Sequence, residues 1–161
     1  MPRFAANLSF LYQEVPLIER IAKAAADGFG AVEYVSPYEL DKHEIATALG
    51  QAGVSQALFN LPAGDWAAGE RGIACLPDRI EEFRAGLDKA VSYAQTLNCP
   101  TVNCLAGLAP ERADAALLDR TLADNLAYAA PRLADAGIAL VFEPINRRDM
   151  PRYHVSTTNH A

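Results

Sequence analysis

The stretch at residues 139–146 reads Ala-Leu-Val-Phe-Glu-Pro-Ile-Asn, and it decides how the rest of the chain is interpreted. Four apolar residues in a row predict a strand that is buried on both faces. Pro144 has no amide hydrogen, so regular strand pairing should fade beside Glu143. In parallel α/β sheets, the carboxyl ends of the strands form the floor of the ligand site. The stretch therefore predicts either a catalytic carboxylate at Glu143 or a surface glutamate paired with Arg147 or Arg148.

Four strand-and-helix units precede this stretch. Each predicted strand is a short apolar segment, and each predicted helix carries an apolar stripe with helical spacing. The strands are expected at residues 4–10, 31–36, 55–60 and 101–107, and the helices at 16–27, 41–52, 78–97 and 112–135. Such alternation is typical of a parallel sheet with right-handed crossovers. We expect residues 1–161 to form a single α/β domain.

Two parallel-sheet architectures fit this alternation, a flavodoxin-like open sheet and a (β/α)8 TIM-type barrel. No strand is followed by a GxGxxG or GxxxxGK[ST] loop, which weakens the case for a phosphate-binding open sheet. A complete barrel needs about 250 residues and eight units. Five strands and four complete helices are visible in the 161 residues. On the barrel interpretation, the chain is the N-terminal portion of such a fold, and residues 147–161 are the loop after its fifth strand.

Composition excludes several classes of protein. The net charge of −6 argues against a nucleic-acid-binding surface, which would need a basic stripe. No apolar run is long enough to span a bilayer, and the first residues lack the apolar core of a signal peptide. The cysteines at 75, 99 and 104 form no CxxC pair, which suits reduced and buried thiols. We therefore expect a cytoplasmic protein that binds neither nucleic acid nor membranes.

Polar residues gather at the predicted strand ends. A parallel sheet would bring these side chains to one rim, and buried sheet faces should not carry so many polar groups without partners. The set comprises Asn7, Ser9, Glu33, Asn60, Asn103, Glu143 and Asn146. Each residue alone fits a solvated polar group or, for Glu33, a salt bridge. Together they predict a substrate site.

The connection at residues 61–77 is unusually long for a compact domain. Loops of this length are usually functional or disordered, and the single tryptophan, Trp66, argues for a folded lid or binding loop. His154 lies beyond the fifth strand, and we expect it near the same rim. No HxxxH, HExxH or GxSxG motif is present. Proton transfer by a carboxylate, or an oxygen-rich site for a divalent ion, is therefore favoured over nucleophilic catalysis.

Three segments make the sequence resemble the hydroxypyruvate isomerase family, which belongs to the xylose-isomerase-like barrels. They are Arg-Phe-Ala-Ala-Asn-Leu-Ser at 3–9, Asn-Leu-Pro-Ala-Gly-Asp-Trp-Ala-Ala-Gly-Glu-Arg-Gly at 60–72, and Glu-Pro-Ile-Asn at 143–146. The resemblance covers nearly the whole chain. The sister 2-oxo-tetronate isomerases share the opening and the Pro-x-Gly-Asp turn, but Asn-Cys-Leu at 103–105 and the Glu-Pro-Ile-Asn motif favour the first family.

The resemblance implies an isomerase that interconverts hydroxypyruvate and 2-hydroxy-3-oxopropanoate (tartronate semialdehyde). Two glutamates of the family relay the proton, and one of them maps onto Glu143. This residue would also help to hold a divalent ion such as Mg²⁺ or Mn²⁺. The second glutamate and the other ligands lie beyond residue 161 in the family pattern. We expect contacts to a small 2-oxo or 3-hydroxy acid from Asn7, Asn60, Trp66, Arg71, Asn103 and His154.

Three alternatives stay open at this point. The chain resembles a 2-oxo-tetronate isomerase almost as well, or it is a non-catalytic fragment that only binds or self-associates. A barrel of the DNA-repair endonuclease type shares the architecture, but the net charge of −6 and the absence of its histidine ligands disfavour it. A sheet lacking strands six to eight would expose its two edges. We therefore expect the isolated chain to form a homo-oligomer or to be poorly soluble, and to lack isomerase activity.

Overall fold

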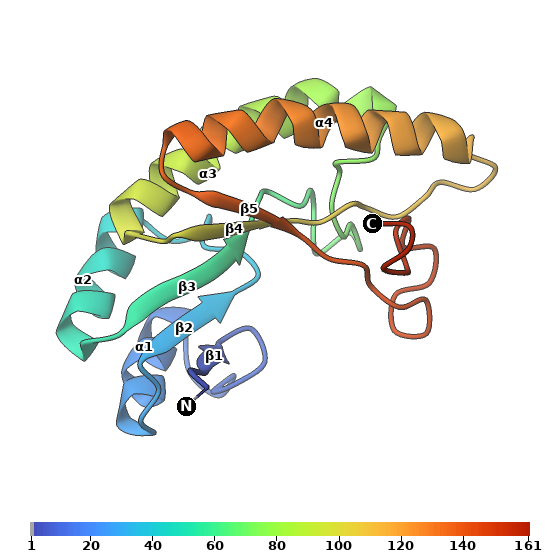
Figure 1. The fold of residues 1–161 in the computed structure, drawn as a ribbon. Coiled ribbons are helices and arrows are strands. Elements are labelled where there is room, and N and C mark those ends of the chain that lie inside the picture. The colour runs from blue at the N-terminus through green and yellow to red at the C-terminus, as the bar shows by residue number, and fades with distance from the viewer. Residues whose placement is uncertain (1) are drawn as a thin grey trace.

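The computed structural model describes residues 2–161 as a curved parallel sheet with helices along its outer face (Figure 1). The strands are β1 (Ala5–Asn7), β2 (Ala31–Tyr34), β3 (Ser55–Asn60), β4 (Thr101–Cys104) and β5 (Ala139–Phe142). The helices are α1 (Leu17–Ala26), α2 (Lys42–Ala52), α3 (Ile80–Leu97) and α4 (Ala115–Asp135), with a short 3₁₀ turn at Pro77–Arg79. The order of elements agrees with the sequence prediction.

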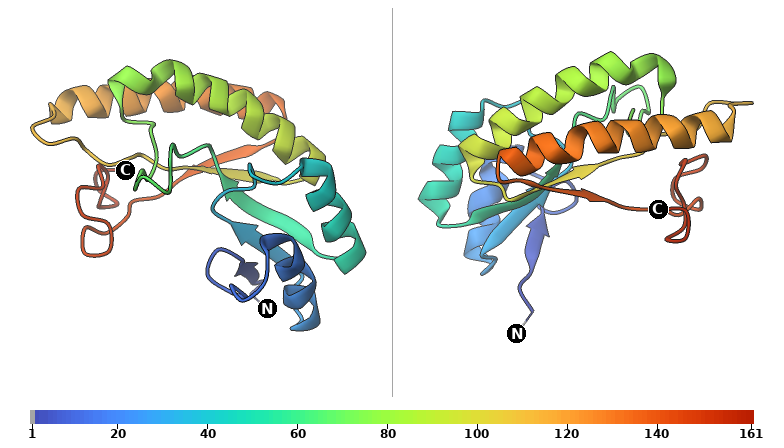
Figure 2. Two further views of the ribbon diagram at one scale, coloured as in Figure 1. Left: turned by 180° about the vertical axis from the view of Figure 1, so that it is seen from behind. Right: turned by 45° about the horizontal axis from the view of Figure 1, so that its top comes forward.

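The spatial order of the strands decides between the two predicted architectures. All neighbouring pairs are parallel, and the order in the sheet is β1-β2-β3-β4-β5, the same as in the chain. A flavodoxin-like sheet would have the order 2-1-3-4-5. Each crossover instead adds the next strand on the same side, so that the sheet curves as the wall of a barrel does (Figure 2). The prediction of a partial (β/α)8 barrel is confirmed.

The hydrophobic core lies between the sheet and the helices. Val32, Phe59 and Val102 are fully buried on the helix side of three adjacent strands. Leu87 of α3 and Leu133 of α4 are also fully buried and belong to the same cluster. Because strand side chains alternate between faces, the next residues along these strands face the other side of the sheet. That concave side is free of helices (Figures 1 and 2).

Local signals explain where two of the helices begin. The Asp41 carboxylate accepts hydrogen bonds from the backbone N–H groups of His43 and Glu44, and so caps α2. Gly53 ends α2 with a φ of 69°, a left-handed conformation that glycine adopts without strain. Asp114 caps α4 in the same way as Asp41 caps α2. His43 is exposed on α2, as the sequence predicts.

The prediction that the strand at 139–142 is buried on both faces is wrong. Residues of β5 alternate between exposed and partly buried, and Val141 is 38% exposed. The strand lies at the edge of the sheet, where α4 covers one face and the concave face is open. β1 and β4 are also shorter than predicted. The chain turns directly after Asn7, whose carbonyl oxygen accepts from the N–H groups of Phe10 and Leu11.

Within the part of the chain that the structure describes, residues 2–161, we find no helix that combines the length and apolar character needed to cross a bilayer.

Gly72, in the long loop before α3, gives a first prediction about stability. Its φ is +107°, and a Cβ atom would lie 2.3 Å from the carbonyl oxygen of Leu105. We expect Gly72→Ala to lower the free energy of unfolding by about 1–3 kcal/mol. Gly50→Ala is the matched control, because Gly50 is helical and has nothing within 4 Å. It should raise stability by about 0.5–1 kcal/mol. Urea denaturation of both variants measures this, and equal midpoints would contradict the prediction.

Candidate active site

A cleft of about 540 Å³ opens on the concave side, at the carboxyl ends of the strands. Each strand end supplies one polar side chain to it: Asn7 from β1, Glu33 from β2, Asn60 from β3, Asn103 from β4, and Glu143 just after β5. The parallel register causes this convergence, because Asn7 is level with Glu33 and Asn60 is level with Asn103. The structure thus brings together five of the seven polar residues that the sequence places at one rim, whereas Ser9 and Asn146 are not among the lining residues of the cleft.

Hydrogen bonds organise these side chains into two groups. Nδ2 of Asn7 donates to Oε1 of Glu33 over 3.0 Å. Nδ2 of Asn103 donates both to Oδ1 of Asn60, at 3.0 Å, and to Oε1 of Glu143, at 3.1 Å. From the sequence alone, a salt bridge for Glu33 and an arginine partner for Glu143 are both possible. In the structure, an asparagine amide binds each of these carboxylates.

Burial differs sharply across the second group. Asn103 is 4% exposed and Asn60 is 7% exposed, whereas the Glu143 side chain is exposed to solvent. The Oδ1 atom of Asn103 is buried without a hydrogen-bond partner. An unpaired buried acceptor is costly, and such an atom beside an open cleft is suited to receive a donor from a ligand. The arrangement presents a carboxylate that can exchange a proton next to amides that can bind oxygen-rich ligands.

Trp66 forms part of the cleft wall from the long loop at 61–77. Its side chain is 41% exposed, and the guanidinium of Arg71 stacks 3.9 Å from the centre of its ring. Arg71 also donates to the carbonyl oxygens of Trp66 and Glu70. The loop is therefore folded, as predicted. Arg71 is not among the lining residues of the cleft, so it holds Trp66 in place and does not itself form the wall.

Glu70 fixes the base of the same loop. Its carboxylate accepts from the backbone N–H of Asp65 at 2.5 Å and pairs with Arg79 at 2.6 Å. The hydrogen bond from Arg79, with the one from Asp65 adding to it, lowers the pKa of Glu70 below its ordinary value. Arg79 also pairs with Glu82 on α3. The loop is thus attached to the start of α3 by a small ionic network.

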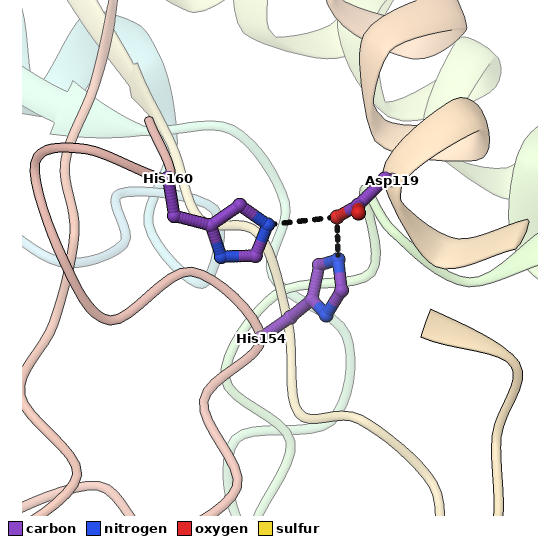
Figure 3. Close-up of side chains that lie close together, drawn as sticks. All are labelled: Asp119, His154 and His160. Atoms are coloured by element: carbon purple, nitrogen blue, oxygen red, sulfur yellow. Dashed lines mark hydrogen bonds and ion pairs between the residues drawn. The ribbon is translucent and has the colours of Figure 1, made fainter. Parts of the chain in front are cut away.

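His154, which the sequence places near the rim, lies outside the cleft. It is 6% exposed, and its Nε2 atom is 2.8 Å from Oδ1 of Asp119 on α4. His160 approaches the same oxygen (Figure 3). Sequence reasoning missed Asp119 and His160, because 35 and 41 residues separate Asp119 from its two partners and no local motif links them.

A larger hollow, of about 840 Å³, lies at the opposite end of the strands. Its lining includes Phe4, Asp27, Ser55 and Pro100, and it contains none of the strand-end carboxylates and amides. Ligand sites in parallel α/β folds lie at the carboxyl ends of the strands, whereas the other end contributes to stability. The smaller cleft is therefore the candidate active site.

A comparison with protein families agrees with this geometry. The model of the family described as "Xylose isomerase-like TIM barrel" matches residues 21–161. The chain belongs to this family. The predicted membership of the xylose isomerase-like barrels is thereby confirmed, and with it the barrel interpretation of the sheet.

Individual relatives within the xylose isomerase-like barrels are informative. The chain is 48% identical over 156 residues to a 2-oxo-tetronate isomerase of Cupriavidus necator, covering 97% of the chain and 60% of the relative. It is 46% identical over 161 residues to a hydroxypyruvate isomerase of Escherichia coli, covering 100% of the chain and 62% of the relative. The chain thus spans about 60% of the length of the curated relatives that it matches.

The chain also resembles a solved crystal structure. A crystal structure named as an AP endonuclease, family 2, from Brucella melitensis superposes with a TM-score of 0.93 at 47% identity. The match covers 96% of this chain and 60% of that one. The high TM-score shows that the curved five-stranded sheet is the arrangement found in a longer barrel.

The residues around Glu143 do not make a cation site by themselves. Among residues 2–161, the one group of three or more possible metal ligands from His, Cys, Asp and Glu is Asp119, His154 and His160, and it excludes Glu143. The Asn103 amide directs its N–H toward Glu143, although a divalent ion would need oxygen atoms there. The predicted metal-ligand role of Glu143 stays a prediction.

The lowered pKa of Glu70 gives a prediction about pH. The group contributes stability above its ordinary value of 4.5, and this contribution is lost as the pH falls through the lower pKa of the folded state. We expect the urea midpoint to fall more steeply from about pH 5 to about pH 3 in the wild type than in Glu70→Gln. Glu39→Gln, at an exposed glutamate outside the loop, is the control and should follow the wild type. Parallel curves for all three proteins would rule out the role of Glu70.

Proposed function

We propose that the cleft binds a small 2-oxo acid and interconverts hydroxypyruvate and 2-hydroxy-3-oxopropanoate, with Glu143 transferring the proton. The observation that carries this proposal is the hydrogen bond from Asn103 to Glu143, which fixes an exposed carboxylate at the mouth of a cleft lined by amides. The E. coli relative named hydroxypyruvate isomerase, 46% identical over the whole chain, supports the choice of substrate.

The chemistry requires only proton movements. In hydroxypyruvate, the carbonyl group is at C2 and the hydroxyl group is at C3. Glu143 would remove a proton from C3, which gives an enediolate, and would return a proton to C2. A proton moves from the C3 oxygen to the C2 oxygen, so that the carbonyl group ends at C3 and no oxidant or reductant is needed. The Nδ2 group of Asn60, whose Oδ1 atom is held by Asn103, would donate to one of the two oxygens, where charge develops.

A 2-oxo-tetronate is the second candidate substrate. The same proton transfer between adjacent carbons would act on it, and the Cupriavidus necator relative with that name is 48% identical. The endonuclease activity that the name of the Brucella melitensis structure suggests is less well supported, because the net charge of −6 is unfavourable for binding a phosphate backbone.

The proposal extends to the metal ion, the cellular compartment and the self-association of the protein. A Mg²⁺ or Mn²⁺ ion at Glu143 would need ligands in addition to those described here. The three cysteines are free and buried, which fits the reducing cytoplasm. Self-association through the open edges of β1 and β5 stays a prediction.

Trp66 provides a direct assay of substrate binding. It is the only tryptophan of the chain and lines the cleft, so a ligand bound there should change its fluorescence. We expect a saturable change when hydroxypyruvate is added to the 161-residue chain, and none with acetate at the same concentration. A titration with 2-oxo-tetronate compares the two candidate substrates. An unchanged signal with both 2-oxo acids would contradict the placement of the substrate.

Replacement of Glu143 tests its role in the reaction. Because the relatives are longer, the assay protein is a chimera of residues 1–161 followed by the remaining part of the E. coli relative. Glu143→Gln keeps the shape and removes the base, so we expect kcat to fall at least about a hundredfold with little change in melting temperature. Glu39→Gln, outside the cleft, should leave kcat unchanged. A Glu143→Gln chimera with near-normal kcat would exclude the residue from the mechanism.

A further inference from the structure

We propose that Asp119, His154 and His160 form a second site, which binds a divalent transition-metal ion such as Zn²⁺. One ligand atom from each residue lies within 4.8 Å of the other two. Figure 3 shows both imidazole rings directed at the same carboxylate oxygen of Asp119. Glu143 and the other cleft carboxylate, Glu33, are not part of this group, so the site is separate from the candidate active site.

The distances between the ligand atoms are close to those that a metal requires. Nε2 of His154 and Nε2 of His160 each lie 2.8 Å from Oδ1 of Asp119. A tetrahedral Zn²⁺ ion with bonds of about 2.0–2.1 Å separates its ligand atoms by about 3.3 Å. The two distances between Asp119 and the histidines therefore need to open by only about 0.5 Å to admit the ion. The two rings are inclined at 73° with centres 5.3 Å apart, so that they are not stacked on each other.

The chemical types of the ligands select the class of metal. Two imidazole nitrogens and one carboxylate oxygen are a common donor set for Zn²⁺ and for non-haem Fe²⁺. Mg²⁺ and Ca²⁺ prefer sites built from oxygen ligands alone. Three protein ligands leave a fourth tetrahedral position for a water molecule.

The surrounding structure holds the ligands in place. His154 is buried, and its backbone N–H donates to the carbonyl oxygen of Gly107 at 3.0 Å. The preceding residue, Tyr153, is fully buried, and its hydroxyl oxygen accepts from the N–H of Ala106 at 2.8 Å. Asp119 lies in the second turn of α4. Ligands fixed in this way lose little conformational freedom when an ion binds.

The position of the site suggests what the metal would do. It would join α4 to the segment at 144–161, which follows β5 and is also hydrogen-bonded to Gly107 through the backbone of His154. Ile145 and Met150 of this segment line the cleft, and the N–H of Ile145 donates to the carbonyl oxygen of Val155, next to His154. The ion would therefore fasten one wall of the cleft to a helix while staying outside the reaction.

The test is metal binding by the 161-residue chain after treatment with a chelator. Calorimetric titration with Zn²⁺ should show one ion per chain, and titration with Co²⁺ should give the intense visible absorption of four-coordinate cobalt. Asp119→Asn and His160→Gln should each weaken Zn²⁺ binding at least about a hundredfold, because removal of a direct ligand exceeds the loss caused by outer partners. His43→Gln is the matched control. This exposed histidine lies on α2, so its replacement should leave the affinity for Zn²⁺ unchanged.

Two outcomes would overturn the proposal. One is a chain that binds no Zn²⁺, or that binds it equally well with and without His160. The other is binding that Glu143→Gln abolishes, which would place the ion in the cleft. The His160 side chain is 37% exposed, so its replacement should leave the fold intact, and a melting curve checks this. The readout is metal affinity and not turnover, so the result is independent of the proposed isomerase activity.

Discussion

The amide group of Asn103 is the interaction on which the cleft depends. Its two N–H groups reach Asn60 at the end of β3 and Glu143 after β5, and so join the ends of three consecutive strands. The register makes this possible, because Asn103 is level with Asn60 on one side and with Val141 on the other. Removal of this donor would leave the buried oxygen of Asn60 unpaired, at a cost of about 1–3 kcal/mol. Stability and the position of the Glu143 carboxylate are thus coupled through one side chain.

Alternation along short strands separates the two tasks of the sheet. In β4, Val102 is buried in the core and Asn103 faces the cleft. In β2, Val32 is buried in the core and Glu33 faces the cleft. Because side chains alternate strictly, a strand of four residues can provide both a core contact and a polar group. The helices cover only the core-forming face, which leaves the polar residues of neighbouring strands free to meet.

The sequence predicts the strands, the helices and the cleft better than it predicts the contacts around the cleft. Apolar runs and glycine stops identify every strand, and the parallel order then implies that Asn7, Asn60, Asn103 and Glu143 meet. Hydrophobicity alone cannot distinguish an edge strand from a central one. The prediction that β5 is buried on both faces is wrong for this reason.

Contacts that depend on tertiary folding explain the other differences between the sequence prediction and the structure. The position of Arg71 against Trp66 depends on how the loop folds, and the cluster around Asp119 depends on where the chain returns after β5. Neither arrangement leaves a periodic or local pattern in the sequence.

The segment at 105–108, directly after β4, supports both walls of the cleft. On one side, the long loop rests on it, because Gly72 forms a bridge with Ala106 and the N–H of Cys75 donates to the Ala106 carbonyl oxygen at 2.8 Å. On the other side, the segment after β5 is bound to it through His154 and Gly107. Two walls that are far apart in the sequence therefore share one support.

This shared support explains the backbone requirement at Gly107. Its φ is +115°, and a Cβ atom there would lie 2.7 Å from the carbonyl oxygen of Gly72. A side chain at this position would push the Trp66 loop away on one side and strain the backbone that holds His154 on the other. The two walls cannot be displaced independently at this point. The cleft and the proposed metal site are thus connected through the chain itself, although no ligand atom is shared between them.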